Sequence, residues 1–268
     1  MPDLSGKVVL ITGASSGIGR ETAVEFARLL CAGLVLTGRN ESNLTQTKQL
    51  CVEAGLSAEK VVIVLGDVTD DQHRQDMLTR TRNVFGRLDV LVNNAGVAPL
   101  NSNVCTGPLE VYDTIMNTNV RAVVAVCKLF LDMLRASKGT IVNVSSVAGL
   151  RPVHAVTYYS MSKSAVDQLT KCLAMELASD GVRVNSVNPA VIRTPLFQTS
   201  GMTEAQAEEM FEGSAKTHPL GRVGLPEEVA KSVAFLASDE ASWTTGVNLP
   251  IDGGRACATP CARHNMTS

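Results

Sequence analysis

The stretch Lys7-Val8-Val9-Leu10-Ile11-Thr12-Gly13-Ala14-Ser15-Ser16-Gly17-Ile18-Gly19-Arg20 joins a β-rich apolar run directly to a glycine-rich turn. Helical periodicity begins at once after the turn, with small or apolar side chains on one face at positions 22, 23, 26 and 27. Glycine lets backbone N–H groups approach a pyrophosphate, and the start of a helix favours its negative charge. The spacing is Gly-x3-Gly-x-Gly rather than the commoner Gly-x-Gly-x2-Gly, but strand, turn and helix start are contiguous. The stretch therefore predicts a dinucleotide site.

Short β-rich runs alternate with helical patterns along the rest of the chain. This alternation predicts an α/β protein with a doubly wound Rossmann fold, a seven-stranded parallel sheet with helices on both faces and right-handed connections. The expected strands are Lys7 to Thr12, Leu34 to Thr37, Val61 to Leu65, Leu88 to Val92, Thr140 to Val144, Val182 to Val187 and Val247 to Ile251.

We expect one nucleotide-binding domain over residues 1–254 and a C-terminal tail over residues 255–268. The domain includes a substrate lid near residues 195–220, which contains a capping-box pattern from Thr203 to Gln206. Ala207, Met210 and Phe211 follow on one side of that helix. This apolar side would contact a hydrophobic substrate or pack against the sheet.

The composition favours work on small molecules. The chain has 268 residues, 45% hydrophobic and 19% charged, with a net charge of -2, so no broad basic surface is available for nucleic acid. No apolar run approaches the roughly 18 residues of a membrane span, and the first residues lack a basic region followed by an apolar one. We expect a cytoplasmic protein with reduced cysteines. Cys257, Cys261 and His264 lack a second ligand pair, so no metal site is expected.

Arg39 bears on the cofactor. In an NAD site an acidic residue lies about 20 residues past the glycines, where it binds the ribose hydroxyls. Here that distance leads to Gly38 and Arg39, which suit a 2′-phosphate. We therefore expect NADP(H) rather than NAD(H), the alternative being a solvated arginine. Asp67, after the third run, is placed to meet the adenine amino group or to cap the next helix.

Tyr159 and Lys163 are four residues apart in a helical pattern, so they share one face. An ammonium beside a phenol hydroxyl could bring the tyrosine pKa from about 10 toward about 7, which needs roughly 4 kcal/mol. One cation about 4 Å away supplies that amount at an effective dielectric near 20. An arbitrary pair at this spacing is a surface tyrosine beside a solvated lysine, so the surroundings decide.

The glycine turn, Asn93-Asn94-Ala95-Gly96, Ser145-Ser146 and Tyr159 with Lys163 occur in a fixed order along the chain. In this combination the chain resembles the short-chain dehydrogenase/reductase family over residues 5–254, and is similar to its 3-oxoacyl-acyl-carrier-protein reductase and carbonyl reductase members. The resemblance implies an NADP(H)-dependent enzyme that interconverts a carbonyl and a secondary alcohol. A 3-oxoacyl thioester, a steroid, a quinone and a small ketone all remain possible substrates.

The resemblance also implies roles for individual residues. Tyr159 would be the general acid or base, and Lys163 would lower its pKa and bind the nicotinamide ribose. Ser146 would hydrogen-bond the substrate oxygen, and Asn119 would hold a water linked to Lys163. The implied cofactor contacts are Gly13, Ser15, Ser16, Gly17, Ile18, Gly19, Arg39, Asn40, Asp67, Val68, Asn93, Ala95, Gly96, Tyr159, Lys163, Pro189, Ile192 and Thr194.

Three residues beside these positions are expected to have no catalytic role. Tyr158 is five residues from Lys163 and so points away from its face. Ser145 is expected to be structural, because adjacent residues of a strand diverge. Ala190 stands where the family usually has glycine, and its Cβ is expected to restrict the nicotinamide loop slightly.

The segment from Ala122 to Leu134 is apolar nearly all round, which predicts a subunit interface and, with the resemblance, a homotetramer. Three alternatives to the main interpretation stay open. One is a non-catalytic NADP(H)-binding sensor, and another is an NAD(H)-dependent alcohol dehydrogenase. The third is a nucleotide-sugar epimerase or dehydratase, although that class normally carries a substantial C-terminal substrate domain.

Overall fold

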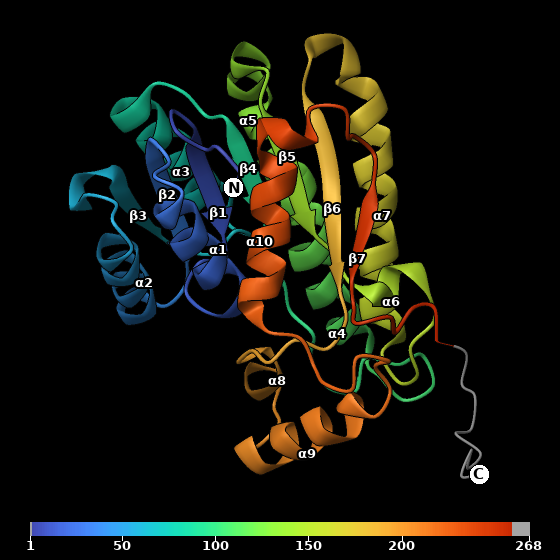
Figure 1. The fold of residues 1–268 in the computed structure, drawn as a ribbon. Helices are drawn as coiled ribbons and strands as arrows, with labels where there is room; N and C mark the ends of the chain where they lie inside the picture. The colour runs from blue at the N-terminus through green and yellow to red at the C-terminus, as the bar shows by residue number, and fades with distance from the viewer. Residues whose placement is uncertain (1, 259–268) are drawn as a thin grey trace, which may run out of the picture.

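Seven parallel strands form one sheet in the order β3-β2-β1-β4-β5-β6-β7 in the computed structural model, which describes residues 2–258 (Figure 1). The predicted fold is confirmed, and each strand lies within two residues of its expected bounds. The strands are β1 Val8–Thr12, β2 Gly33–Gly38, β3 Val61–Leu65, β4 Val90–Asn93, β5 Thr140–Val144, β6 Arg183–Pro189 and β7 Asn248–Ile251.

The strand order reverses at β1. This strand pairs with β2 on one side and with β4 on the other, and the two halves of the sheet lead away from it in opposite directions. Connections that leave β1 and β4 therefore diverge, which opens a crevice at the carboxyl ends of these two strands. Ligands of doubly wound proteins bind at such a switch point.

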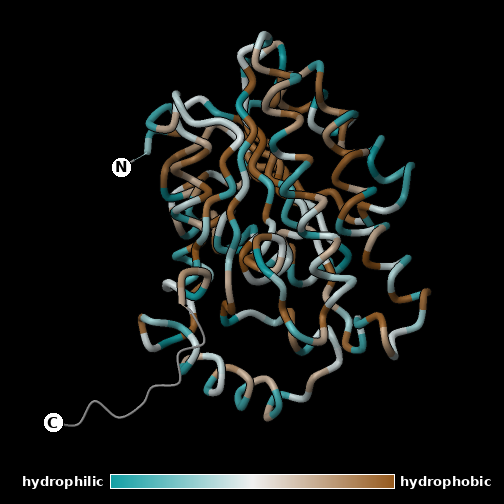
Figure 2. The backbone as a smooth tube through the Cα atoms, turned by 90° about the vertical axis from the view of Figure 1, so that its right-hand side faces the viewer, coloured by the Kyte–Doolittle hydropathy of each residue, from teal (hydrophilic) through white to brown (hydrophobic). Residues whose placement is uncertain are grey.

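Helices cover both faces of the sheet, and each layer has its own apolar core. On one face α1 (Gly17–Arg28), α2 (Glu41–Glu53) and α10 (Pro226–Ala237) pack over a core that includes Phe26. On the other face the core includes Phe130, beneath α3 (Asp71–Phe85), α5 (Ala122–Ser137) and α7 (Thr157–Glu176). Figure 2 shows the most hydrophobic backbone at the centre, along the strands.

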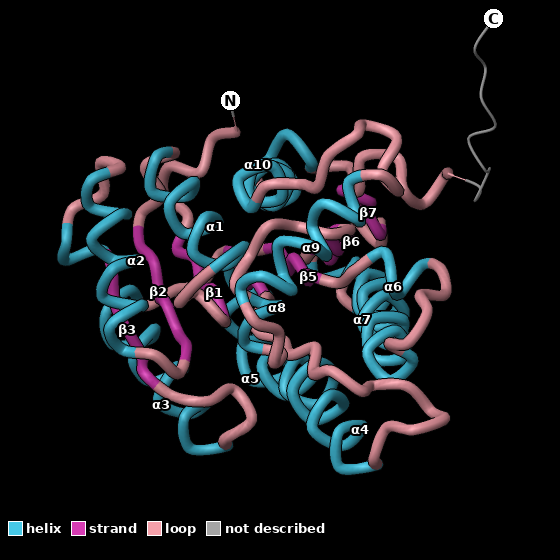
Figure 3. The backbone as a smooth tube through the Cα atoms, turned by 90° about the horizontal axis from the view of Figure 1, so that it is seen from below, coloured by secondary structure: helices cyan, strands magenta, loops and turns pink. Residues whose placement is uncertain are grey.

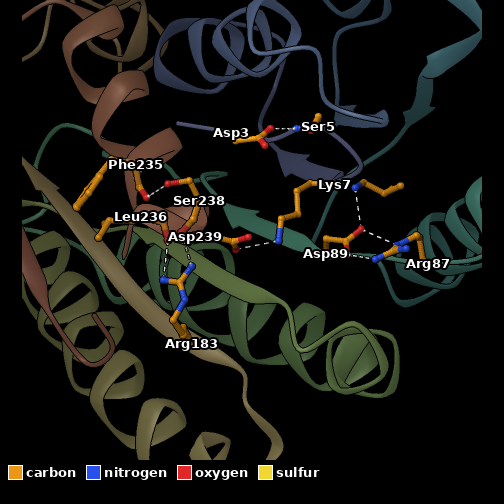
Figure 4. Close-up of polar contacts among 11 residues, drawn as sticks. Asp3, Ser5, Lys7, Arg87, Asp89, Arg183, Phe235, Leu236, Ser238 and Asp239 are labelled. Atoms are coloured by element: carbon orange, nitrogen blue, oxygen red, sulfur yellow. Dashed lines mark hydrogen bonds and ion pairs between the residues drawn. The ribbon is translucent and has the colours of Figure 1, made fainter. Parts of the chain in front are cut away.

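Polar contacts tie the amino ends of the strands together (Figure 4). The Asp89 carboxylate, just before β4, accepts a hydrogen bond from the Val8 backbone N at 2.9 Å and pairs with Arg87. Arg183, at the start of β6, donates to backbone carbonyl oxygens at the end of α10. These side chains hold the edge opposite the crevice, so the carboxyl edge remains for function.

Shorter helices gather at the carboxyl edge, the lower end in Figure 1 and the end that faces the viewer in Figure 3. The predicted capping box is confirmed, because Thr203 and Gln206 bond each other's backbone at the start of α9. Ala207 and Phe211 are buried on the inner side of α9. The remaining elements are η1 Ala58–Lys60, α4 Leu109–Met116, η2 Asn117–Arg121, α6 Val147–Leu150, η3 Ala178–Asp180, α8 Leu196–Thr199, α9 Glu204–Ala215 and η4 Asp239–Ala241.

Lys138 ends α5 in the left-handed conformation, with φ 49° and ψ 47°. Glycine adopts this conformation without the steric cost of a Cβ, so Lys138→Gly is expected to raise the free energy of unfolding by about 1 kcal/mol. Equilibrium urea unfolding measures it. Lys231→Gly, at an exposed position inside α10, is the matched control and should lower that free energy by about 1 kcal/mol. A loss of stability in Lys138→Gly would contradict the prediction.

Candidate active site

The glycine turn leaves the start of α1 open for an anion. Ser16, the N-cap of α1, makes no side-chain hydrogen bond to the helix, and the first turn contains no acidic residue. The free N–H groups and the positive end of the helix dipole therefore remain available. A Cβ on Gly19 would collide with the Gly13 carbonyl oxygen, so only glycine allows this close turn.

Asn94 fastens the turn to the end of β4. Its Nδ2 donates to the carbonyl oxygens of Thr12 at 2.9 Å and Gly13 at 3.0 Å. In return the Thr12 hydroxyl accepts hydrogen bonds from the backbone N of Asn94 and of Ala95, both at 3.0 Å. These bonds join the two strands of the switch point. The sequence marked Asn94 only as part of the Asn93-Asn94-Ala95-Gly96 motif and assigned it no role of its own.

Two residues expected to bind the cofactor use side-chain atoms in hydrogen bonds within the chain. Asn93 Nδ2 donates to Asn143 Oδ1 at 2.9 Å within the sheet. Asn40 is the N-cap of α2, where its Oδ1 accepts from the Asn43 backbone N at 2.9 Å. Any contact of Asn93 or Asn40 with a cofactor therefore falls to the backbone or to the remaining side-chain atoms.

Arg39 and Asp67 stand together at the carboxyl ends of β2 and β3. The Arg39 guanidinium is 3.6 Å from the Asp67 carboxylate, and the Arg39 side chain is 71% exposed. Asp67 also accepts hydrogen bonds from the backbone N and the hydroxyl of Thr69, so it fixes the turn that follows β3. An exposed guanidinium with most of its donors free fits a phosphate group.

Tyr159 lies in the first turn of α7, and its hydroxyl has an environment that the sequence did not predict. Burial raises the pKa of Tyr159 to about 12, although a hydrogen bond with Ser146 acts in the opposite direction. Lys163 Nζ lies 5.6 Å from the centre of the Tyr159 ring and donates to the Val144 carbonyl oxygen at 2.8 Å. The shift of the Tyr159 pKa is therefore opposite to the expected lowering, because desolvation of the buried hydroxyl is the largest effect on it.

Tyr158 turns away from Tyr159. Its hydroxyl donates to the Gly107 carbonyl oxygen at 2.9 Å, and its ring meets that of Tyr112 edge to face. The geometry agrees with the sequence argument that separated the two tyrosines. Tyr158 secures the loop before α4.

Ser146 follows the end of β5 by two residues and caps α6. Its Oγ accepts from the Ala148 backbone N at 3.1 Å and lies 3.4 Å from the Pro189 carbonyl oxygen. Ser145 instead donates from its hydroxyl to the Lys163 carbonyl oxygen at 3.1 Å, which is a structural contact. The two serines diverge, as expected for neighbours at a strand end.

Asn119 lies in η2, a π-helical turn that interrupts one continuous run of helix between α4 and α5. Such turns are rare and often occur at functional sites. The Asn119 side chain bonds both backbone groups of Val97, at 2.8 and 2.9 Å, and donates to the Ser162 hydroxyl at 3.1 Å. It thereby clamps the segment after Gly96 against α7.

The segment after β6 returns to the glycine turn. A Cβ on Gly17 would lie 3.2 Å from the Thr194 side chain, so the segment expected to hold the nicotinamide lies beside the expected pyrophosphate turn. Ala190 has no positive φ, and its backbone N donates to the Ile251 carbonyl oxygen at 3.1 Å. Its Cβ therefore causes no left-handed backbone strain, and its effect on the approach of a nicotinamide ring stays a prediction. A cavity of about 150 Å³ adjoins Ala190 and Ile192 and is lined on its far side by His218.

The uncapped helix start, the closely fitted glycines and the exposed guanidinium together suit a dinucleotide that carries an extra phosphate. In residues 2–258, no three His, Cys, Asp or Glu side chains are grouped to hold a metal ion, and no helix is long and apolar enough to cross a membrane. Cys257 is exposed, whereas Cys261 and His264 lie outside the described residues.

Comparison with known proteins relates the chain to a family of reductases and dehydrogenases. A family model described as enoyl-(acyl carrier protein) reductase matches residues 13–256. The 3-oxoacyl-[acyl-carrier-protein] reductase FabG of Thermotoga maritima is 40% identical over 253 residues, which cover 94% of this chain and 98% of the relative.

Two solved structures extend the comparison. A Caenorhabditis elegans short-chain dehydrogenase/reductase of unknown function, solved with cofactor, is 34% identical with a TM-score of 0.94, over 98% of this chain and all (100%) of the other. A Brucella melitensis 3-ketoacyl-(acyl-carrier-protein) reductase, solved with NADH, is 32% identical with a TM-score of 0.84, over 95% of this chain and 100% of the other.

Proposed function

The chain belongs to the short-chain dehydrogenase/reductase family, and from that premise we propose that it is an NADP(H)-dependent carbonyl reductase. Members of this family are oxidoreductases that act on alcohol and carbonyl groups. The observation that carries the proposal is the convergence of Tyr159, Lys163 and Ser146 at the carboxyl edge, beside a glycine turn with an exposed Arg39.

Each catalytic residue has a separate task. Bound NADP(H) would supply or accept the hydride. Tyr159 keeps its proton at neutral pH, because burial raises its pKa to about 12, and it donates that proton to the carbonyl oxygen in the reductive direction. Ser146, bonded to Tyr159, is placed to donate a hydrogen bond to the same oxygen. Lys163 contributes a buried positive charge beneath the tyrosine ring.

The cradle for the cofactor would consist of the turn from Gly13 to Gly19 for the pyrophosphate and Arg39 for the 2′-phosphate. Ile192 and Thr194 would meet the carboxamide, and Asp67 with Val68 would border the adenine. The NADH in the Brucella relative makes NAD(H) the alternative cofactor. Arg39 favours NADP(H), because an exposed guanidinium with one loose carboxylate partner gains most from a dianionic phosphate.

A panel of carbonyl compounds tests the proposal. Purified protein is mixed with NADPH or NADH and a 3-oxoacyl thioester, a steroid ketone, a quinone or a small ketone. A 2-enoyl thioester is included because the matching family model is described by enoyl reduction. Consumption of NADPH with a carbonyl compound is the expected result. Tight NADPH binding without turnover of any compound would instead favour the non-catalytic sensor.

We propose further that the protein assembles as a homotetramer through the outer side of α5. Val124 is 43% exposed on that side, and Leu109 of α4 is 69% exposed. Val124→Arg is expected to shift the wild-type tetramer to smaller species in sedimentation velocity, because a desolvated charge opposes association. Leu30→Arg, at a residue 60% exposed after α1, is the control. Unchanged sedimentation of Val124→Arg would reject this interface.

A further inference from the structure

Asp167 lies on the buried side of α7, one helical turn beyond Lys163 and two beyond Tyr159. It is only 5% exposed. Its Oδ1 accepts a hydrogen bond from Asn188 Nδ2 at 2.8 Å, whereas its Oδ2 is buried against Gly149. The sequence contains the same signal that marked Tyr159 and Lys163, a spacing of four residues, but an acidic residue in a helix is usually solvated.

Asn188 links Asp167 by hydrogen bonds to Ser146 and to the end of β6. The same Nδ2 donates to the Ser146 carbonyl oxygen at 3.0 Å, and Asn188 Oδ1 accepts from the Ser186 hydroxyl at 2.8 Å. Asn188 directly precedes Pro189, which begins the segment expected to hold the nicotinamide. The Asp167 carboxylate thus fixes the Asn188 side-chain amide. That amide in turn bonds the Ser146 backbone and the end of β6, just before the segment expected to hold the nicotinamide.

The charge of Asp167 requires an explanation of its own. Among residues 2–258, no lysine or arginine side chain forms an ion pair with it within 4.0 Å. Burial raises the pKa of Asp167, so desolvation opposes ionisation. A neutral asparagine could accept the same hydrogen bond from Asn188 without that cost. The negative charge is useful only if a nearby cation gains from it.

The charged groups that act on Asp167 are Lys163 and Lys171 of its own helix. The groups that face it from other elements are neutral, namely Ser145, just after β5, and Asn188 of β6. Lys163 is the buried member of the two lysines. Around Lys163, the ionisable neighbours are Tyr159 and Asp167, while Val144 of β5 presents a carbonyl oxygen. The neutral Asn119 side chain of η2 lies near Gly96, as the Lys163 ammonium does.

We propose that Asp167 is a positioning residue, which keeps Lys163 charged and holds Asn188 and Ser146 in place. The inference rests on the proposed function of the site. Burial lowers the pKa of Lys163 to about 8, and the Asp167 carboxylate raises it. Without that carboxylate, Lys163 would lose its proton at a lower pH. The lysine would then supply no positive charge to Tyr159 or to the ribose hydroxyls it is expected to bind.

Asp167→Asn tests this, because it removes the charge and preserves the shape. The alkaline limb of the pH profile of kcat/KM for carbonyl reduction is expected to move down by about one pH unit, the order for a neighbouring buried charge. NADPH binding, followed by its fluorescence, should weaken about 3-fold to 10-fold at pH 8.5 and stay unchanged at pH 6. Asp180→Asn, which breaks the surface pair with Arg135, is the matched control and should leave both profiles in place.

Three results would overturn the inference. Identical profiles for wild type and Asp167→Asn would mean that the charge has no effect. A uniform loss at every pH would indicate a structural role alone. A downward shift of the alkaline limb without any pH-dependent change in NADPH binding would mean that Asp167 acts on Tyr159, whose pKa it also raises, because the Tyr159 proton is lost at that limb.

The proposed function can fail separately. If wild type reduces no carbonyl compound, that function is rejected, and the pH dependence of NADPH binding still decides the role of Asp167. Should Asp167→Asn not fold, Asp167→Ser retains a hydrogen-bond acceptor without the charge and is measured in the same two assays. Its profiles support or overturn the inference by the same criteria.

Discussion

Replacing Tyr159 by Phe is expected to lower kcat for carbonyl reduction by about three orders of magnitude, within the range that general acid catalysis contributes. The variant keeps the ring that lies against Lys163 and removes only the hydroxyl that carries the proton. It also loses the hydrogen bond with Ser146. Steady-state rates of NADPH oxidation, with the best carbonyl compound from the panel, measure the effect.

Tyr158→Phe is the matched control for this prediction. It removes the hydroxyl of the adjacent tyrosine, which bonds the Gly107 carbonyl oxygen at 2.9 Å outside the proposed catalytic group. We expect kcat to change by less than about 10-fold and the free energy of unfolding to fall by about 1 kcal/mol. NADPH affinity should be close to wild type in both variants. Full activity in Tyr159→Phe would remove Tyr159 from the mechanism.

Strand positions followed from the sequence because strands buried on both faces read as short, nearly continuous β-branched runs. The run Val61 to Leu65 coincides with β3 at both ends. Helix ends with a side-chain signature were equally accessible, as Thr203 and Gln206 illustrate. Local chemistry decides such features, so tertiary packing does not need to be known.

The electrostatic state of the site could not be predicted in this way. The spacing of Tyr159 and Lys163 indicated a common helix face, but it could not tell how deeply the neighbouring elements bury both groups. Desolvation depends on β5, η2 and β6, which come from distant parts of the chain, and it reverses the expected direction of the Tyr159 pKa. The π-helical turn at Asn119 was hidden for the same reason, since η2 packs against α7, which follows much later in the chain.

Arg39→Asp is expected to change the preference between NADPH and NADH, measured as the ratio of their kcat/KM values, by about 100-fold or more. Loss of one charge-assisted contact with a 2′-phosphate costs about 1.5–3 kcal/mol, which is roughly 10-fold to 150-fold in affinity. The new carboxylate adds repulsion toward that phosphate and can accept hydrogen bonds from ribose hydroxyls, as acidic residues of NAD sites do. NADPH should therefore lose more than NADH gains, because the introduced carboxylate would also lie close to that of Asp67.

Arg28→Asp makes the same change of charge on α1, where the arginine pairs with Glu25 on the protein surface. It controls for the effect of net charge on a polyanionic cofactor, and its NADPH to NADH ratio should stay within about 3-fold of wild type. An unchanged ratio in Arg39→Asp would mean that Arg39 is a solvated partner of Asp67. The proposed cofactor preference would then fail, while the roles of Tyr159 and Ser146 would stand, because the proton transfer does not depend on which nicotinamide cofactor is bound.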